Sequence, residues 1–569
     1  MKEQIYLSTD TVIVNLSAQP CNSADEIAGS EGFSSFLQLY FKQLAVRDIR
    51  VYRWLTNGRS LEEIVPSLIE LVRQLLVSGK MSAAEPMSEM DRYKALYIVE
   101  DCYSCWRSKK RFTVLNSNRS KAIASRFVDY DEKYCHLIRQ IYRKCRQRLL
   151  GRDDKVYRQS ESGSNGSALL AKYRLKLPGE YAALRNVPFI SRLLLHTPIM
   201  MEFDSSYRMR EPLFLEDNPL ATAPFDSRDY FCLPLKVGDF LCLTYFHKDY
   251  MAQAICLTNL FELAEEVDCL SRKAELICLF GLPGEHGSCG YYHDEREGVH
   301  LAAVSCNYNN EHFAIFRDAV FTLHNLALMD RDILPVRGAM MEILFHDDSR
   351  KNLLLIGELG AGKSETIEAL RSLSNEIRTD KSVRRVEVVF DDVGSLRIAD
   401  GKVVAKGSAI GGLEGIDDLW QSIYRDIEKG IFINLQKDDP KVLLPITSYE
   451  MVSAEHAVDM VLYANNYENR IGVERFEKYE DCRRCLREGR HMVIDDQGKE
   501  EFTSTYFANP YGPAQREEQC QPIMDQVFGK LYENDVFVGQ LFTNLASNQK
   551  DRLQESARCL WELIRQLDS

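Results

Sequence analysis

Apolar residues recur every three or four positions through most of the first 160 residues. The segments 33–41 and 61–72 show this spacing, and residues 134–149 carry it farthest. There one apolar stripe is formed by Tyr134, Leu137, Ile138, Ile141, Tyr142, Cys145 and Leu149, with basic residues on the other side. This period is typical of amphipathic helices. The pattern therefore predicts a mainly helical region over residues 1–165.

The pattern changes after a polar stretch at residues 159–167, whose serine and glycine content predicts a linker or loop. Beyond it, apolar runs at 231–235 and 240–246 are mixed with a helical segment at 252–264. From about residue 335 onward, strand-like and helical segments alternate. We therefore expect an α/β protein with a mixed α+β N-terminal half, divided into residues 1–165, a mixed lobe over 166–332 and a C-terminal domain over 333–569.

Composition narrows the class of protein. The chain has 569 residues, of which 45% are hydrophobic and 27% charged, as expected for a globular protein of several domains. A net charge of −13 argues against general binding to nucleic acid or an acidic membrane surface. No apolar run approaches the roughly 20 residues that span a bilayer, and the N-terminus lacks a signal-peptide core. We therefore expect a cytoplasmic protein with reduced thiols; its oligomeric state stays open.

Two C-x-x-C pairs, Cys102/Cys105 and Cys482/Cys485, leave two interpretations open. Together they could supply four zinc ligands. The first pair lies in a segment with a helical pattern and no glycine knuckle, which favours buried thiols instead.

Residues 357–364 complete the pattern G-x-x-x-x-G-K-S. An apolar run at 352–356 precedes them and a helical segment at 365–373 follows, which is the context of a phosphate-binding loop. Glycines let backbone N–H groups converge on a phosphate, and the helix N-terminus adds positive potential. The residues predicted to bind the donor are Gly357, Glu358, Leu359, Gly360, Ala361, Gly362, Lys363, Ser364 and Glu365.

Within this set, Lys363 can reach the terminal phosphates and the Ser364 hydroxyl suits Mg²⁺. Asp391 and Asp392 follow a strand-like run at 386–390. Two acids at the C-terminal end of a strand near such a loop can hold Mg²⁺ or accept a proton from an attacking hydroxyl. We therefore predict Ser364, Asp391 and Asp392 as metal ligands, and catalytic roles for Lys363 and both aspartates.

The segments 334–343, 355–366 and 390–392 together resemble the core of the phosphoenolpyruvate carboxykinase and HPr kinase superfamily. Residues 362–366 look most like HPr kinase, whereas 442–449 and 502–511 look more like the carboxykinase. The resemblance covers roughly residues 333–545, with a fainter match at 206–214 as a candidate substrate strand. It implies a PEP carboxykinase-like P-loop kinase domain that uses Mg²⁺, or Mn²⁺, with ATP, GTP or pyrophosphate as phosphoryl donor.

At some positions this chain differs from the two families, and these differences change the function that we expect. Arg337 stands where both families have a histidine, which in carboxykinases is a Mn²⁺ ligand. Arginine cannot ligate a metal because its guanidinium stays protonated, but it can clamp a phosphate or carboxylate. Lys441 likewise stands in place of a carboxykinase arginine. We therefore predict Arg337 as a catalytic anion clamp, in a kinase that phosphorylates a hydroxyl of a small molecule such as a polyol or an amino acid.

Three alternatives stay open. The chain could be a true phosphoenolpyruvate carboxykinase that uses ATP or GTP. It could be an HPr-type protein serine kinase or phosphorylase, for which residues 411–418 offer a further resemblance with Glu414 near the metal. It could also be a non-catalytic nucleotide-binding regulator whose basic helices before residue 150 contact a partner. The sequence identifies neither the acceptor nor the donor.

Overall fold

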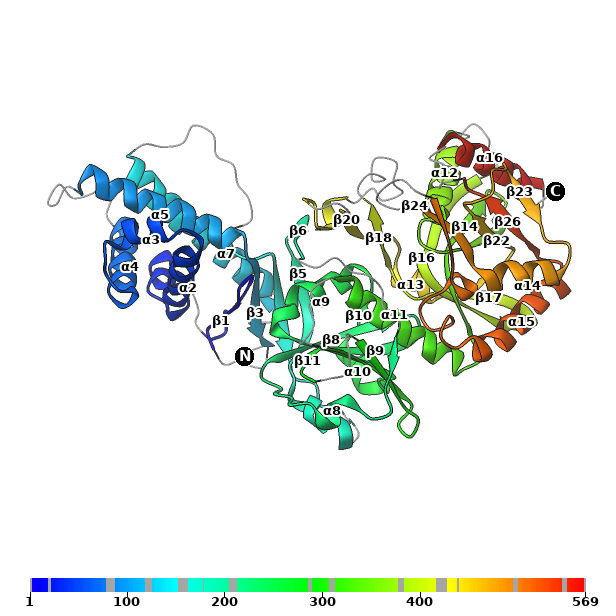
Figure 1. Cartoon of the computed structure of the whole chain (residues 1–569), viewed down its shortest axis with the longest axis horizontal. Helices are drawn as coiled ribbons and strands as arrows, with labels where there is room; N and C mark the ends of the chain where they lie inside the picture. Colours follow the sequence, from blue (N-terminus) through cyan, green and yellow to red (C-terminus); the bar gives the residue numbers. More distant parts are fainter. Residues whose placement is uncertain are drawn as a thin grey trace.

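The computed structural model describes residues 3–18, 22–77, 87–117, 125–151, 162–175, 177, 179–203, 212–284, 289–305, 313–376, 383–415, 427–436, 440–494, 500–544 and 550–566. The chain is an α/β protein with several mixed sheets. Figure 1 shows three parts in a row: N-terminal helices, a central sheet, and a C-terminal domain with its own sheet. Most of the fainter match at 206–214 and the Glu414 side chain lie outside the described residues.

The predicted N-terminal helices are present in the described part of residues 1–165. The predicted apolar stripe of α7 is confirmed at five positions, which are buried: Tyr134, Leu137, Ile141, Cys145 and Leu149. Its other two members, Ile138 and Tyr142, are half-buried. On its basic side Arg146 donates to Glu100 of α5 over 2.6 Å. The helices are α1 (Ala24–Ala28), α2 (Glu31–Arg47), α3 (Ile49–Thr56), α4 (Leu61–Val77), α5 (Glu89–Arg107) and α7 (Phe127–Leu150).

The same region also supplies strands to the central sheet, which has 12 strands. Its path runs through β1 (Ile5–Leu7), β2 (Thr11–Asn15), β3 (Lys110–Asn116), β4 (Gly166–Ala171), β5 (Phe189–Leu195), β8 (Tyr230–Val237), β9 (Phe240–His247), β11 (Leu276–Leu282), β13 (Val299–Ser305), β12 (Cys289–Asp294) and β7 (Leu213–Phe214). The boundary that we drew at residue 165 falls between β3 and β4, which pair in parallel with Phe112 opposite Gly166.

The prediction of a linker at residues 159–167 is wrong for residues 162–167, the part that the structure describes. Ser162, Ser164 and Ser167 are fully buried, and the Trp106 indole N–H donates to the Ser162 carbonyl over 2.6 Å. Small polar residues fit here because three hydroxyls surround a buried carboxylate: those of Thr113, Ser164 and Ser167 lie 2.8–3.0 Å from Asp131 Oδ1. Composition alone could not separate this packed turn from a linker.

The buried pair of Asp131 and His196 gives a prediction of pH dependence. His196 Nε2 lies 2.5 Å from Asp131 Oδ2, and this bond, with a second to Cys135, raises the pKa of His196 to about 10. The unfolded value is about 6.5, so the pair stabilises the fold fully below pH 6.5 and progressively less as the pH rises toward 10. We expect the unfolding midpoint of the wild-type chain to fall as the pH rises from 6.5 toward 10. In His196→Gln the midpoint should fall less over the same pH range. The same slope in this variant and in an exposed control, His346→Gln, would contradict the pairing.

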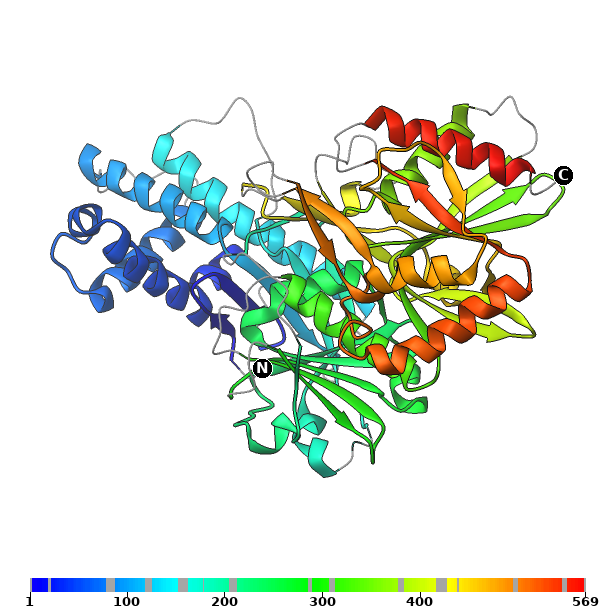
Figure 2. The same cartoon turned by 45° about the vertical axis from the view of Figure 1, so that its right-hand side comes forward.

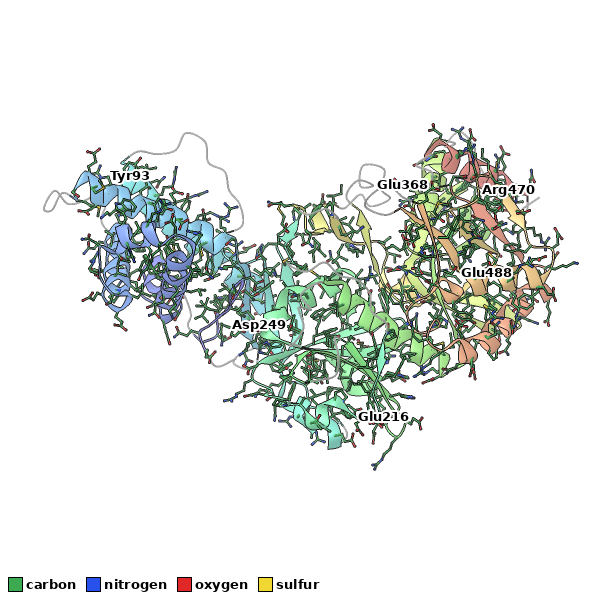
Figure 3. All side chains as sticks on the ribbon, viewed as in Figure 1. Tyr93, Glu216, Asp249, Glu368, Arg470 and Glu488 are labelled. Carbon is green, nitrogen blue, oxygen red and sulfur yellow. The ribbon has the colours of Figure 1, made fainter. Side chains whose placement is uncertain are left out.

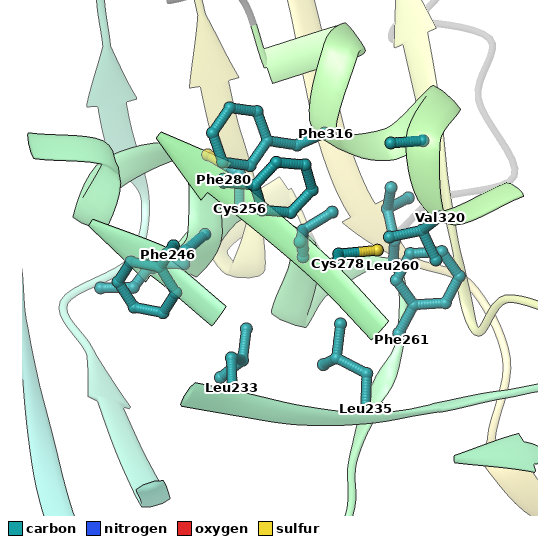
Figure 4. Packing of buried hydrophobic residues seen from close by; sticks show 14 of the residues in the cluster. Leu233, Leu235, Phe246, Cys256, Leu260, Phe261, Cys278, Phe280, Phe316 and Val320 are labelled. Carbon is teal, nitrogen blue, oxygen red and sulfur yellow. The ribbon is translucent and has the colours of Figure 1, made fainter. Parts of the chain in front are cut away.

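The main core lies between the central sheet and α11 (Phe313–Met329) (Figure 4). Phe316 stacks on Phe280 with ring centres 3.8 Å apart, and Phe321 packs against Phe261. All residues of α11 are buried, because the helix also contacts β14 (Leu334–Phe345) of the C-terminal sheet. The helix predicted at 252–264 is shorter: α9 spans Met251–Cys256, and a short strand pairs at Glu262–Leu263.

The C-terminal sheet has eight strands with helices on both faces. Helices α12 (Lys363–Glu376) and α16 (Lys550–Gln566) pack on one face, and α14 (Tyr479–Glu488) and α15 (Glu517–Glu533) on the other (Figure 2). Its order is β21 (His456–Ala457), β17 (Lys402–Gly407), β16 (Val383–Ala399), β14 (Leu334–Phe345), β15 (Arg350–Ile356), β22 (Met460–Asn465), β26 (Phe537–Phe542) and β23 (Val473–Arg475).

A small sheet joins the two halves of the chain. Its order is β18 (Gly411–Gly415), β20 (Lys441–Pro445), β19 (Ile431–Ile433) and β6 (Ile199–Met201). β6 comes from the N-terminal half and pairs in parallel with β19, with Ile199 opposite Ile431.

The two C-x-x-C pairs do not come together. Cys102 and Cys105 lie on α5, whereas Cys482 and Cys485 lie on α14 at the other end of the molecule (Figure 1). This separation excludes one shared four-thiolate site. Burial raises the pKa of all four thiols. Among the described helices, none has the length and apolar character needed to cross a membrane.

Candidate active site

The predicted phosphate-binding loop leaves β15 at the edge where two parallel neighbours, β22 and β26, also end. Gly360 and Gly362 have φ angles of +73° and +93°, a backbone conformation that other residues rarely adopt. The loop is closed by hydrogen bonds from Gly357 N to Arg337 O (3.2 Å) and from Ala361 N to Glu358 O (3.1 Å). Helix α12 then begins at Lys363. Strand, loop and helix therefore occur in the predicted order.

Three polar side chains hold the loop from outside, and the sequence analysis named none of them. Thr543 Oγ1 donates to Ala361 O over 2.8 Å, and Asn466 Nδ2 donates to Gly360 O over 3.2 Å. Thr366 Oγ1 donates to Gly362 O over 2.6 Å. Asn466 and Thr543 each directly follow a parallel strand, β22 and β26. Because ligands of open α/β sheets bind at the carboxyl ends of strands, this position was the available signal.

The two glycines allow a matched test of the loop. A Cβ on Gly362 would lie 2.7 Å from Thr543 Cβ, whereas a Cβ on Gly360 would meet nothing within 4 Å. Both alanine variants carry a backbone penalty of about 1–2 kcal/mol, and overpacking adds about 1–3 kcal/mol in Gly362→Ala. We therefore expect Gly362→Ala to lower the thermal unfolding midpoint clearly more than Gly360→Ala. Equal midpoints would show that the loop does not pack against Thr543.

Lys363 lies inside this loop rather than in solvent. It is 6% exposed, and its Nζ donates to the Glu358 carbonyl over 2.8 Å. Burial and the charge of Arg337 lower the pKa of Lys363, while Asp391 and Asp392 act in the opposite direction. The ammonium group therefore sits where the loop backbone folds around it, with both predicted carboxylates near enough to influence it.

The two aspartates are not at a strand end, which corrects the sequence-based expectation. β16 continues from Val383 to Ala399, and Asp391 and Asp392 stand opposite Ala339 and Gly338 of β14. The register of this pairing shifts between Met340 and Met341. The strand continues because Val393 and Leu396 are both fully buried, Val393 in the main core and Leu396 in the core of the C-terminal sheet.

Asp392 departs from ordinary strand geometry. Its φ angle is +119°, and such a conformation in a non-glycine residue costs about 1–3 kcal/mol and is concentrated at functional sites. The two carboxylates also differ in access: Asp391 is 5% exposed, whereas the Asp392 side chain is 19% exposed. The two carboxylates are therefore not equivalent in their access to solvent.

Arg337 is buried at the mouth of the loop. Its guanidinium donates to Glu358 Oε1, and its Nε lies 3.4 Å from Asp392 Oδ1. It also lies over the Tyr511 ring, 5.1 Å from the ring centre. Glu358, a residue of the loop itself, is a partner that the sequence analysis did not identify.

This ion pair leaves polar atoms unsatisfied. Within the described part of the chain, Arg337 Nε and Glu358 Oε2 are buried and make no hydrogen bond. Many other charged side chains are exposed, among them Glu216 and Glu488, which Figure 3 labels. Buried and incompletely paired charges are costly, and they are typical of sites that await a charged ligand.

The helix α11 brings a second buried charge pair to this site. Arg317 Nε donates to Asp318 Oδ1 over 2.9 Å, and Arg317 donates to the Tyr511 hydroxyl over 3.3 Å. Burial lowers the pKa of Arg317, but Tyr511, Asp318 and Asp392 outweigh burial and raise it well above its usual value. Tyr511 therefore contacts two arginines, Arg317 from the central core and Arg337 from the C-terminal sheet.

His491 is a further residue that the sequence analysis missed. It lies on β24 (Arg490–Ile494), is 6% exposed, and its Nε2 is 2.8 Å from Thr503 Oγ1. Its pKa is lowered chiefly by burial, and also by the charges of Arg337 and Lys363. Burial and the two nearby cations thus disfavour the protonated form of this imidazole.

Comparison with known proteins assigns no family to this chain. No protein-family model matches it, and no curated protein matches it.

Proposed function

We propose that this chain is a phosphotransferase, a kinase that moves a phosphoryl group from ATP, GTP or pyrophosphate to a hydroxyl of a small molecule such as a polyol or an amino acid. The observation that carries the proposal is the complete phosphate loop with its buried Lys363, faced by two carboxylates and by Arg337. Such transfer depends on positioning and electrostatic stabilisation, which this arrangement supplies.

The donor phosphates would be held by the loop amides and by Lys363. In the described part of the chain Lys363 Nζ donates to a backbone carbonyl of the loop itself, that of Glu358, so exchange for a phosphate oxygen leaves no buried side chain without its partner. Arg337 would neutralise charge on the transferred group. Arginine is suited to this because its planar guanidinium binds two oxygens at once.

The residues around the loop fit a hard divalent cation. Ser364 is half-buried at the first turn of α12, and Asp391 and Asp392 supply carboxylate oxygens. Oxygen ligands suit Mg²⁺, or Mn²⁺, and when bound the ion would neutralise charge on the donor phosphates. Asp391, the more buried carboxylate, is the candidate ligand. Asp392, the more exposed one, is the candidate acceptor of the substrate hydroxyl proton.

The carboxykinase alternative is less well supported by these residues. The position that would carry a metal-binding histidine is Arg337, and its guanidinium is engaged with Glu358. Arginine stays protonated and cannot take over a metal-ligand role. The HPr-type alternative retains the loop but predicts a protein as acceptor.

A donor-by-acceptor screen with the purified full chain tests the proposal. ATP, GTP and pyrophosphate are each supplied with Mg²⁺ and a panel of polyols, hydroxyl amino acids, HPr protein and oxaloacetate, and products are followed by ³¹P NMR. We expect a phosphate ester that requires both one donor and one small acceptor. Phosphoenolpyruvate from oxaloacetate, phosphorylated HPr alone, or no donor consumption with any acceptor would each overturn the proposal.

A further inference from the structure

Three potential metal-ligating side chains converge away from the phosphate loop. His293 of β12 and His300 of β13 are directly opposite each other on adjacent antiparallel strands. Their rings are stacked, with centres 4.1 Å apart and planes inclined by 8°. Asp330, just after α11, completes the group. Two strands and a helix end thus fix three side chains that the proposed phosphoryl transfer does not use.

One nitrogen of each imidazole in this group lies near the same carboxylate oxygen. His300 Nε2 lies 3.0 Å from Asp330 Oδ2, and His293 Nδ1 lies 3.7 Å from the same oxygen. All three donor atoms lie within 4.8 Å of one another. Ligand atoms that share one zinc-like ion at about 2.1 Å lie about 3.0–3.5 Å apart. The separation of His300 from Asp330 is already in this range, and His293 would move slightly inward on binding an ion.

The surroundings both orient the group and leave it open. The His300 side chain is 6% exposed, whereas those of His293 and Asp330 are 28% and 27% exposed, so an ion and water can reach them. Asp330 is held through its other oxygen, which accepts from Gln519 Nε2 over 2.9 Å and lies 3.7 Å from Arg516. Such outer contacts fix the direction in which a ligand points. The positive charge of Arg516 also offsets part of the negative charge of Asp330, which limits the affinity of the site for a cation.

We propose that His293, His300 and Asp330 bind a divalent transition-metal ion such as Zn²⁺, Co²⁺ or Ni²⁺, with water completing its coordination. Two imidazoles and one carboxylate suit these ions, whereas Mg²⁺ prefers oxygen ligands alone. The site is independent of the proposed kinase activity. Because Asp330 also contacts α15, the ion would connect the central sheet to the C-terminal domain.

A second cluster, Asp131, Cys135 and His196, also brings three such donors together. There the carboxylate is fully buried and already bonded to His196 and to three hydroxyl groups. These hydrogen bonds are sufficient to explain why the three side chains of that cluster lie together. It serves as an internal control because it contains a thiol, which the proposed site lacks.

Cobalt titration of the chelator-treated full chain tests the proposal. We expect one Co²⁺ per chain, with visible d–d bands and no thiolate-to-cobalt charge-transfer band. His293→Asn should weaken binding about 10²-fold, in the range found when metal-site residues are changed. The exposed control His346→Asn should leave binding unchanged. Asp330→Asn, which keeps the side-chain volume, is the second variant and should also weaken binding.

Unfolding midpoints measured without metal establish that each variant is folded. The proposal is overturned if the wild-type chain takes up no Co²⁺, if both His293→Asn and Asp330→Asn bind it as tightly as wild type, or if a charge-transfer band appears and is lost in Cys135→Ser.

Discussion

Replacing Lys363 by alanine is expected to reduce phosphoryl transfer by about 10²-fold or more, as loss of one preorganised electrostatic contact does in other enzymes. The fold should remain, because Lys363 Nζ bonds one loop carbonyl and is not an element of the apolar core. Steady-state turnover with the donor and acceptor found by the screen gives the activity, and the thermal unfolding midpoint reports the fold.

Lys402→Ala is the matched control for this variant. Lys402 is an exposed lysine of the same sheet, on β17, so its loss removes one positive charge without touching the loop. Turnover of Lys363→Ala equal to that of Lys402→Ala would remove the loop from the mechanism.

Replacing Arg337 by methionine is expected to produce the largest loss of stability. The change leaves the Glu358 carboxylate buried without its cation, and breaking a buried ion pair in this way costs about 3–5 kcal/mol. The double variant Arg337→Met with Glu358→Gln removes the stranded charge and should recover most of the loss. Donor binding should stay impaired in both, because the anion clamp is missing.

Unfolding midpoints of the wild-type, single and double variants provide the measurement. A chain of several domains does not unfold in one step, so the midpoints of the same transition are compared directly. If the double variant is no more stable than Arg337→Met, the cost does not come from an unpaired Glu358. If donor binding is normal in either variant, Arg337 is a structural residue only.

The local parts of the site could be predicted from the sequence. The loop at 357–364 and the helix after it follow from short-range patterns, because glycine spacing and helical periodicity are both local signals. The position of Asp391 and Asp392 was only partly predictable. Both carboxylates influence the pKa of Lys363, but the strand does not end there.

The partners of these residues could not be predicted, because they come from distant parts of the chain. Glu358 pairs with Arg337 across 21 positions, and Tyr511 contacts Arg317 across 194. Arg317 and Asp318 interrupt the apolar run over residues 313–321, which was a signal that the sequence analysis did not use. Residues 502–511 were singled out only as a resemblance, and the structure adds that Tyr511 lies against Arg337.

The central claim, that this loop binds a phosphoryl donor, is tested most directly by calorimetric titration of the full chain. ATP, GTP and pyrophosphate are each titrated with Mg²⁺ into wild type, Lys363→Ala and Lys402→Ala. We predict that at least one donor binds wild type and Lys402→Ala with the same affinity, and binds Lys363→Ala at least about 10-fold more weakly, a loss of about 1.4 kcal/mol. Equal affinity for all three proteins, or no binding of any donor to wild type, would contradict the claim.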